Sequence, residues 1–177
     1  NAVAAPMPGN DTMTIKVIGH RWWWEFQYPD QGNFKTANEM RIPVDKKVLL
    51  EVTSVDVIHS FWPPQLSGKM DVVPGVVNKT WIISDEIGEF GGYCAEFCGE
   101  QHANMRFKVI VQSQADFDAW AAGQVQAVAA PATDLEIEGQ KIVAQGVCIG
   151  CHTIQGTNAK GVTGPDLTKL YSRTTLA

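Results

Sequence analysis

Long apolar runs are missing from this sequence of 177 residues, which contains no stretch of 18 or more apolar residues, so we expect no transmembrane helix within it. An initiator methionine is also missing, as is the charged, apolar and small-residue pattern of a signal peptide. Positive charge is scarce, since 14 basic residues stand against 19 acidic ones, for a formal net charge of −5. That balance disfavours nucleic acid and suits a basic docking partner.

Cysteine is rare, and its four residues are unevenly placed. They form two close pairs, Cys94 with Cys98 and Cys148 with Cys151, which indicates cofactor ligation rather than a disulfide framework. Hydrophobic residues make up 45% of the chain and charged residues 19%, so a core can form without disulfides. The length allows one domain or two small ones.

The first cysteine pair lies in a segment rich in soft metal ligands. It presents Cys94, Cys98, His102 and Met105, spaced Cys-x-x-x-Cys-x-x-x-His-x-x-Met. Thiolate, imidazole and thioether groups select copper over magnesium or calcium. Because two thiolates can bridge two metals, we predict a two-copper centre in a loop, with a second imidazole supplied from upstream by His59.

Two alternatives compete for this loop. A Cys/Cys/His/His zinc site would use the same thiols and imidazoles, but zinc gains little from Met105. A disulfide between Cys94 and Cys98 would leave His102 and Met105 without a purpose.

Short strand-like segments separated by turn residues fill residues 12–112, which predicts an antiparallel sandwich or barrel. In the segment 22–28 we expect Trp24 and Phe26 to pack in the core, with Trp23 on the opposite face. Residues 85–92 form a glycine-rich approach to the ligand loop, and Tyr93 leads into that loop. The strands that we expect cover 13–18, 22–28, 40–42, 47–53, 56–63, 76–83 and 106–111.

The second cysteine pair belongs to Cys148-Ile-Gly-Cys151-His152, the pattern of covalent c-type haem attachment. The thiols would bond the haem vinyl groups, and His152 would bind the iron. An amphipathic helix is expected over 136–147. A thioredoxin-like redox pair or half of a zinc site is the alternative, and the histidine directly after Cys151 argues against both.

Four segments, in this order along the chain, resemble subunit II of haem–copper cytochrome c oxidases. They are Gly19-His-Arg-Trp-Trp-Trp24, Asp56-Val-Ile-His-Ser-Phe61, Lys69-Met-Asp-Val-Val-Pro-Gly75 and the ligand loop. The resemblance covers residues 12–112 and implies a mainly β, cupredoxin-like Greek-key β-barrel that holds a binuclear copper centre, CuA. It also implies two membrane helices ahead of this domain, so we expect a chain that begins at Asn1 to be a processed or cut piece.

The same resemblance implies roles for single residues. The Glu96 side chain would reach a magnesium ion shared with subunit I. Trp22 would be the exposed aromatic residue through which electrons enter, whereas Asp56 is either a docking acid or a turn cap. The implied copper ligands are the bridging Cys94 and Cys98, the terminal His59 and His102, the weak ligand Met105 and the Glu96 carbonyl.

Residues 135–177 resemble the start of a small α-helical class I cytochrome c domain. The segment Gly164-Pro165-Asp166-Leu167 is similar to the loop after the haem motif, and Pro165 would accept a hydrogen bond from His152. That family uses a distal methionine, and none follows Met105, so we expect the haem domain to be incomplete in this sequence. Residues 1–11 would be an N-terminal arm, and 113–134 a helix and an interdomain linker.

A copper domain fused to a cytochrome c is the layout of caa-type oxidases, and it implies an electron-transfer subunit. Electrons would pass from cytochrome c or another donor protein through haem c and CuA to haem a of subunit I, where the proton-translocating oxidase reduces oxygen. This places the domain at the outer, periplasmic or extracellular, face of the bacterial cytoplasmic membrane. The alternatives are the CuA domain of a denitrification reductase and a structural zinc-binding module.

Overall fold

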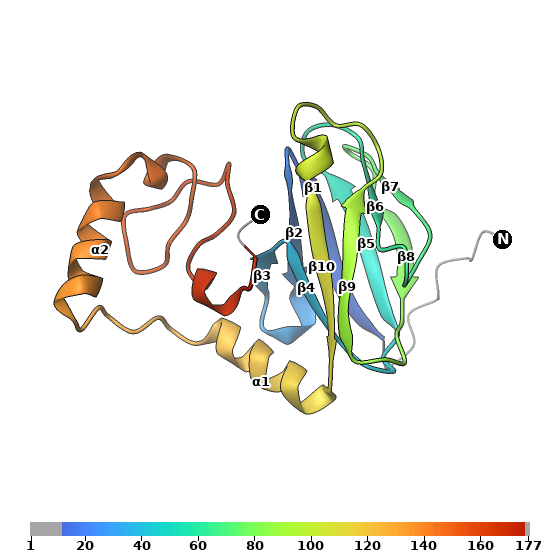
Figure 1. Cartoon of the computed structure of the whole chain (residues 1–177), viewed down its shortest axis with the longest axis horizontal. Coiled ribbons are helices and arrows are strands. Elements are labelled where there is room, and N and C mark those ends of the chain that lie inside the picture. The colour runs from blue at the N-terminus through green and yellow to red at the C-terminus, as the bar shows by residue number, and fades with distance from the viewer. Residues whose placement is uncertain (1–11, 176–177) are drawn as a thin grey trace.

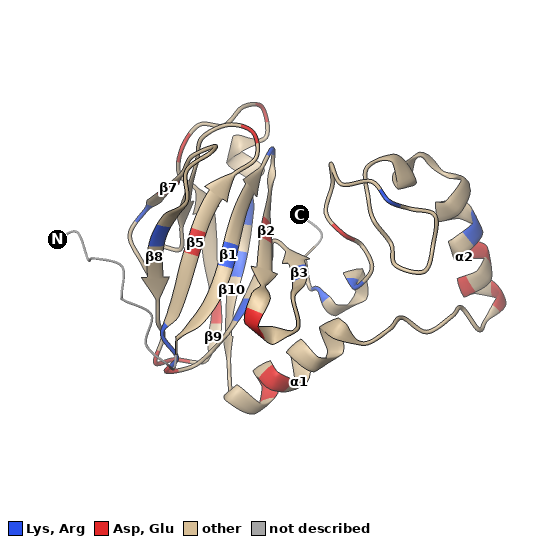
Figure 2. Ribbon diagram, turned by 180° about the vertical axis from the view of Figure 1, so that it is seen from behind, with Lys and Arg blue, Asp and Glu red and all other residues tan. Residues whose placement is uncertain are grey.

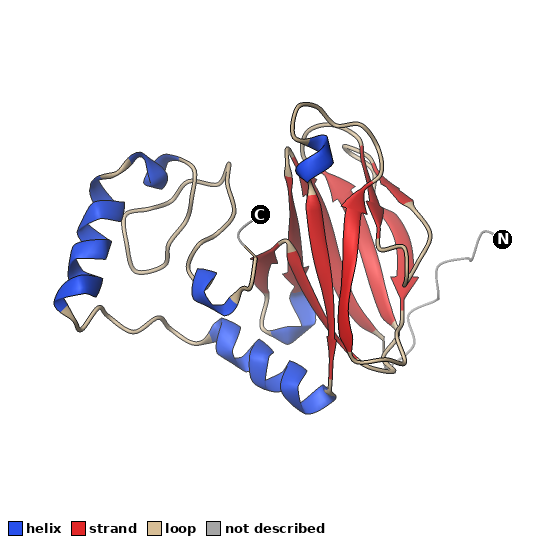
Figure 3. Cartoon of the chain, in the orientation of Figure 1, coloured by secondary structure: helices blue, strands red, loops and turns tan. Residues whose placement is uncertain are grey.

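The computed structural model describes residues 12–175, and the expected arm over 1–11 lies outside the described residues. Within that range ten strands form two five-stranded sheets, and two helices follow them in the chain (Figures 1 and 3). One sheet has the order β3 (Phe34–Ala37), β2 (Trp23–Tyr28), β1 (Met13–His20), β5 (Val48–Ser54) and β8 (Asn78–Ile82). The other has the order β4 (Glu39–Pro43), β10 (Arg106–Gln112), β9 (Gly88–Cys94), β6 (His59–Trp62) and β7 (Met70–Val72).

Strand direction departs from the expected antiparallel pattern at two places. β1 pairs with β5 in parallel, and β10 pairs with β4 in parallel, whereas the other pairs are antiparallel. Both parallel pairs join strands that are far apart in the sequence, because the chain crosses between the sheets before it returns. The expectation of a mainly β, two-layered domain is confirmed, and the expectation of wholly antiparallel pairing is wrong.

The core lies between the two sheets and is rich in aromatic side chains. Trp24, Phe26 and Tyr28 of β2 are fully buried, as the alternation of the sequence predicts for this strand. Phe61 and Phe107 stack with ring centroids 4.4 Å apart, and Trp24 meets each of them edge-on at 5.5 Å. These rings fill the barrel directly beneath the ligand loop.

Several boundaries differ from the sequence expectations. β2 begins at Trp23, so Trp22 lies outside the strand. The glycine-rich approach to the loop contains the strand β9, and β3, β7 and β9 were not among the expected strands. Glycine lowers strand propensity when it is read alone, but Gly92 is required here, because a Cβ atom would lie 2.1 Å from the Phe107 ring.

Two helices follow the barrel, α1 (Gln114–Val125) and α2 (Asp134–Gln145). Ser113 caps α1, and Phe117 on its inner face is buried in the core. A capping box of Thr133 and Glu136 starts α2 two residues earlier than expected. The short 3-10 helices are η1 (Pro29–Gln31), η2 (His102–Asn104), η3 (Val147–Gly150) and η4 (Leu170–Ser172).

The C-terminal segment returns from α2 to one side of the barrel, as the orange and red part of Figure 1 shows. Acidic side chains mark both α1 and α2 (Figure 2). No helix in residues 12–175 combines the length and the apolar character needed to cross a bilayer.

Candidate metal centre

The ligand loop joins two neighbouring strands at one end of the barrel. β9 ends at Cys94 and β10 begins at Arg106, and the two strands pair in antiparallel register. The Cys94 amide donates to the Met105 carbonyl at 3.0 Å, which closes the base of the loop. β6 flanks β9 on its other side, and His59 at the start of β6 therefore lies beside Cys94.

The predicted ligand atoms form one chain of contacts. His59 Nδ1 lies 3.8 Å from Cys94 Sγ, and the Sγ atoms of Cys94 and Cys98 are 3.8 Å apart. Cys98 Sγ in turn lies 3.6 Å from His102 Nδ1 and 3.7 Å from Met105 Sδ. Each thiol thus has one imidazole beside it.

The Glu96 backbone completes the group, since its carbonyl oxygen lies 3.2 Å from Cys94 Sγ. Both cysteines are free thiols. Their sulfur–sulfur distance is far longer than the roughly 2 Å of a disulfide. A loop that holds two buried thiols apart while two imidazoles approach them is suited to binding metal.

The two thiols differ in their readiness to ionise. Burial raises the pKa of Cys94, but hydrogen bonds from His59 and from the backbone outweigh it and bring the value to about 6. Burial and the negative charge of Cys94 raise the pKa of Cys98 to about 12. A cation would remove that repulsion between neighbouring thiolates, so metal binding should release a proton from this loop.

Asp56 holds the His59 ring in the required orientation. Its Oδ1 atom lies 2.8 Å from His59 Nε2, which leaves Nδ1 facing the thiols. The carboxylate also accepts hydrogen bonds from the backbone amides of Val57 and Arg21, each at 2.6 Å. Burial lowers the pKa of His59, but its hydrogen bonds to Cys94 and Asp56 outweigh this and raise it overall.

This orienting role is one that the sequence analysis missed, because it considered Asp56 only as a docking acid or a turn cap. The available signal was an acid three residues before the histidine predicted as a ligand, where a bend brings the two side chains together. Such a contact fixes the tautomer of a ligand.

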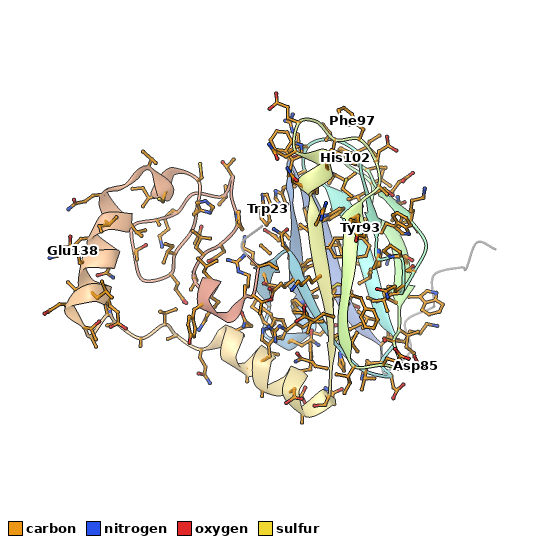
Figure 4. All side chains as sticks on the ribbon, in the orientation of Figure 1. Trp23, Asp85, Tyr93, Phe97, His102 and Glu138 are labelled. Carbon is orange, nitrogen blue, oxygen red and sulfur yellow. The ribbon has the colours of Figure 1, made fainter. Side chains whose placement is uncertain are left out.

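Two other predicted residues lie on or beside the loop. Trp22 is half-buried, and its Nε1 donates to the Cys98 carbonyl at 3.1 Å. The Glu96 residue is exposed on the loop, next to the exposed Phe97 (Figure 4).

The second cysteine pair lies in and directly after η3, where Cys148 and Cys151 are exposed, free thiols. His152 Nδ1 lies 2.7 Å from the Pro165 carbonyl, which leaves Nε2 available to a metal. Val147 and Val162 are 93% and 76% exposed, so apolar surface flanks the motif. Thiols, an oriented imidazole and uncovered apolar side chains together fit a flat, apolar, covalently attached group.

Comparisons with known proteins agree with this geometry. A family model described as "Cytochrome C oxidase subunit II, periplasmic domain" matches residues 30–114. Cytochrome c oxidase subunit 2 of Alkalihalophilus pseudofirmus is 42% identical over 172 residues, which cover 97% of this chain and 49% of that protein. The Bacillus subtilis protein of the same name is 33% identical, covering 94% and 49%. The chain thus spans about half the length of these curated relatives.

Two solved structures are similar in fold and sequence. The periplasmic domain of cytochrome oxidase subunit II from Bradyrhizobium japonicum superimposes with a TM-score of 0.64 at 35% identity, covering 67% of this chain and 96% of that one. A mixed disulfide intermediate between a thioredoxin-like protein and cytochrome c oxidase subunit II gives a TM-score of 0.61 at 34% identity, covering 69% and 96%.

Proposed function

Because this chain belongs to the cytochrome c oxidase subunit II family, we propose that it receives electrons at a binuclear copper centre and passes them to subunit I of the oxidase. The membership and the buried His/Cys/Cys cluster support a copper site of the CuA type. Copper supplies one-electron redox chemistry. The remaining work, which is to hold the ligands and to set their surroundings, belongs to the residues of this chain.

The observation that carries the proposal is the sequence of contacts His59–Cys94–Cys98–His102. Two thiols placed between two imidazoles would offer each of two metals a nitrogen ligand and a share of both sulfurs. Met105 and the Glu96 carbonyl lie within 4 Å of one thiol each and serve as weaker ligands. Rigid strands on both sides of the loop keep these ligands in place, so little needs to move when an electron arrives.

We extend the proposal to haem c, held by Cys148, Cys151 and His152. The Pro165 carbonyl orients the His152 ring, as second-shell partners of metal-binding histidines do. The domain organisation that follows has copper-binding residues in 12–112, a helix and linker in 113–134, and a cytochrome c region in 135–177. This arrangement is that of a caa-type oxidase.

The same proposal also gives roles to Trp22 and Glu96 and implies partner proteins. Trp22 admits electrons that reach the copper loop from outside, because its indole contacts the Cys98 carbonyl. The exposed Glu96 carboxylate binds magnesium at the contact with subunit I, since magnesium favours few carboxylate ligands and several waters. The domain lies at the outer face of the membrane, where cytochrome c or a similar protein supplies electrons.

The test is to quantify copper and covalently bound haem on one purified sample of the chain. We expect two coppers and one haem for each polypeptide. Stoichiometric zinc would refute the copper assignment, and copper without covalent haem would refute only the assignment of the second motif.

A further inference from the structure

The C-terminal segment is held on the barrel by a buried carboxylate. Glu39 of β4 is 2% exposed, and its Oε1 atom accepts hydrogen bonds from the amides and hydroxyls of Thr174 and Thr175 at 2.6–3.0 Å. Arg41 on the same strand donates to the Ser172 carbonyl at 3.3 Å. These contacts fix residues 172–175 against one edge of the barrel.

The docked segment reaches the barrel a second time at Trp23. The Trp23 indole nitrogen donates to the Thr163 carbonyl at 3.4 Å, and the residue is 7% exposed. Figure 4 shows Trp23 on the side of the barrel that faces the C-terminal segment. Thr163 precedes Gly164, and a Cβ atom on Gly164 would lie 2.6 Å from the His152 ring. The haem motif is therefore one residue away from the Trp23 contact.

Trp23 is also connected to the metal centre through β1. Its ring stacks on His20, with centroids 4.0 Å apart and planes inclined by 13°. His20 follows Gly19, which lies directly against the His59 ring, because a Cβ atom there would be 2.7 Å from His59 Cδ2. Packed contacts thus run without a break from His152 to His59.

We propose that Trp23 carries electrons within the chain, from the haem motif to the copper centre, by a path separate from Trp22. Electron tunnelling weakens steeply across gaps between atoms, and the stack of Trp23 on His20 joins the C-terminal segment to β1, whose Gly19 lies against the His59 ring. Trp22 instead contacts the copper loop at the Cys98 carbonyl. The two neighbouring tryptophans therefore serve an internal and an external source.

With both groups bound, the step would move one electron, which would oxidise the group held at His152 and reduce the group held at Cys94 and Cys98, and it would exchange no bond or proton. The external donor protein supplies that electron. This inference rests on the proposed function, because it needs both groups to be bound by the chain.

The test compares Trp23→Leu with the unmodified full chain, loaded with copper and haem. A light pulse excites a ruthenium photoreductant, which reduces the haem. The reoxidation of the haem is then followed by its absorbance. Trp81→Leu is the matched control, since Trp81 lies on β8 at the opposite edge of the same sheet. Trp23→Phe keeps an aromatic ring but removes the donor to Thr163.

Two readouts do not depend on electron transfer by the loaded chain. They are hydrogen exchange at residues 161–175 and the electron paramagnetic resonance spectrum of the copper. We expect Trp23→Leu to lose most of the fast phase of haem reoxidation, which reports electron transfer within the chain. The copper spectrum and the protection of residues 172–175 from hydrogen exchange should be retained. Trp23→Phe should fall between Trp23→Leu and the unmodified chain, and Trp81→Leu should match the unmodified chain.

Internal transfer at the unmodified rate in Trp23→Leu would overturn the route, and so would its loss in Trp22→Leu alone. A chain that binds copper but no haem would overturn the haem assignment and, with it, the route, and would leave the copper centre of the proposed function standing. Metal and haem analysis of the unmodified chain therefore separates the two failures.

Discussion

At the scale of single residues, the sequence predicted which side chains gather at the loop, but it did not predict the carboxylate that orients His59. The spacing of Cys94, Cys98, His102 and Met105 in one short loop indicates a soft metal site. The sequence also indicated His59 as the upstream imidazole, but the pairing of β6 with β9, which brings it to the loop, is visible only in the structure. The role of Asp56 depends on a bend between β5 and β6 that no periodic pattern shows.

Asp56→Asn tests this orienting role. The amide keeps the size of the side chain but removes the charge that faces His59 Nε2. We expect copper affinity to fall by about 10- to 100-fold, as is usual when such a partner is removed. Competition titration with a copper chelator measures the change. Asp85→Asn is the control, because Asp85 lies at the opposite end of the barrel (Figure 4). This variant should bind copper with the affinity of the unmodified chain.

Cys98→Ser tests whether the thiols bridge two metals. Cys98 touches Cys94, His102 and Met105, so its loss removes the atom that the two halves of the site share. We expect the variant to retain at most one copper, with the unpaired electron confined to it. Copper analysis measures the number of coppers bound, and electron paramagnetic resonance shows whether the unpaired electron is shared between two of them. Cys148→Ser, in the other motif, should leave the copper spectrum unchanged, and a delocalised spectrum in Cys98→Ser would refute bridging.

At the scale of elements, apolar strands were predictable and glycine-rich ones were not. Trp24 and Phe26 alternate with polar residues, and their burial in β2 follows from that pattern. β9 was not predicted, because the glycine that makes room for the Phe107 ring of another strand, Gly92, also lowers strand propensity. The sequence places Trp23 on the face of the strand opposite to Trp24. It cannot show the contact of Trp23 with Thr163, because the two residues are 140 positions apart in the chain.

Gly92→Ala tests the close packing of β9. The added methyl group would overlap the Phe107 ring, which is itself stacked on Phe61 and cannot easily move. We expect the free energy of unfolding to fall by about 2 kcal/mol. Chemical denaturation measures this. Gly91→Ala in the same strand meets only ordinary contacts, at 3.5 Å and beyond, so equal destabilisation of both variants would contradict the packing account.

Glu39 makes the docking of the C-terminal segment dependent on pH. Burial raises the pKa of Glu39, but the hydrogen bonds from Thr174 and Thr175 outweigh it, so the pKa lies below the ordinary value of 4.5. The docked state therefore gains its full stabilisation above pH 4.5. That stabilisation is lost as the pH falls through the lower pKa of the docked state.

Glu39→Gln should weaken docking by about 2 kcal/mol, because a charged acceptor is replaced by a neutral one. Protection factors of the Thr174 and Thr175 amides, measured by hydrogen exchange between pH 3 and pH 7, report the change. Glu138→Gln removes an equal charge from the exposed face of α2 and should have no effect. Unchanged protection of these amides in Glu39→Gln would show that the segment is held elsewhere.

At the scale of the whole molecule, one barrel carries the ligand loop and the C-terminal segment on two separate surfaces. The ligand loop lies at one end, and the C-terminal segment contacts Trp23 of β2 in one sheet and Glu39 of β4, the edge strand of the other sheet (Figure 1). Local patterns revealed both cysteine motifs, but their relative positions depend on contacts between residues far apart in the chain. The crossovers that make β1 parallel to β5 bring Gly19 and His59 together, and no local pattern encodes that contact.

The most direct measurement of the central claim is the electron paramagnetic resonance spectrum of the copper-loaded chain, recorded together with its copper content. If Cys94 and Cys98 bridge two metals, the spectrum shows one unpaired electron coupled equally to two copper nuclei. A single copper with the spectrum of a blue-copper site would contradict the account.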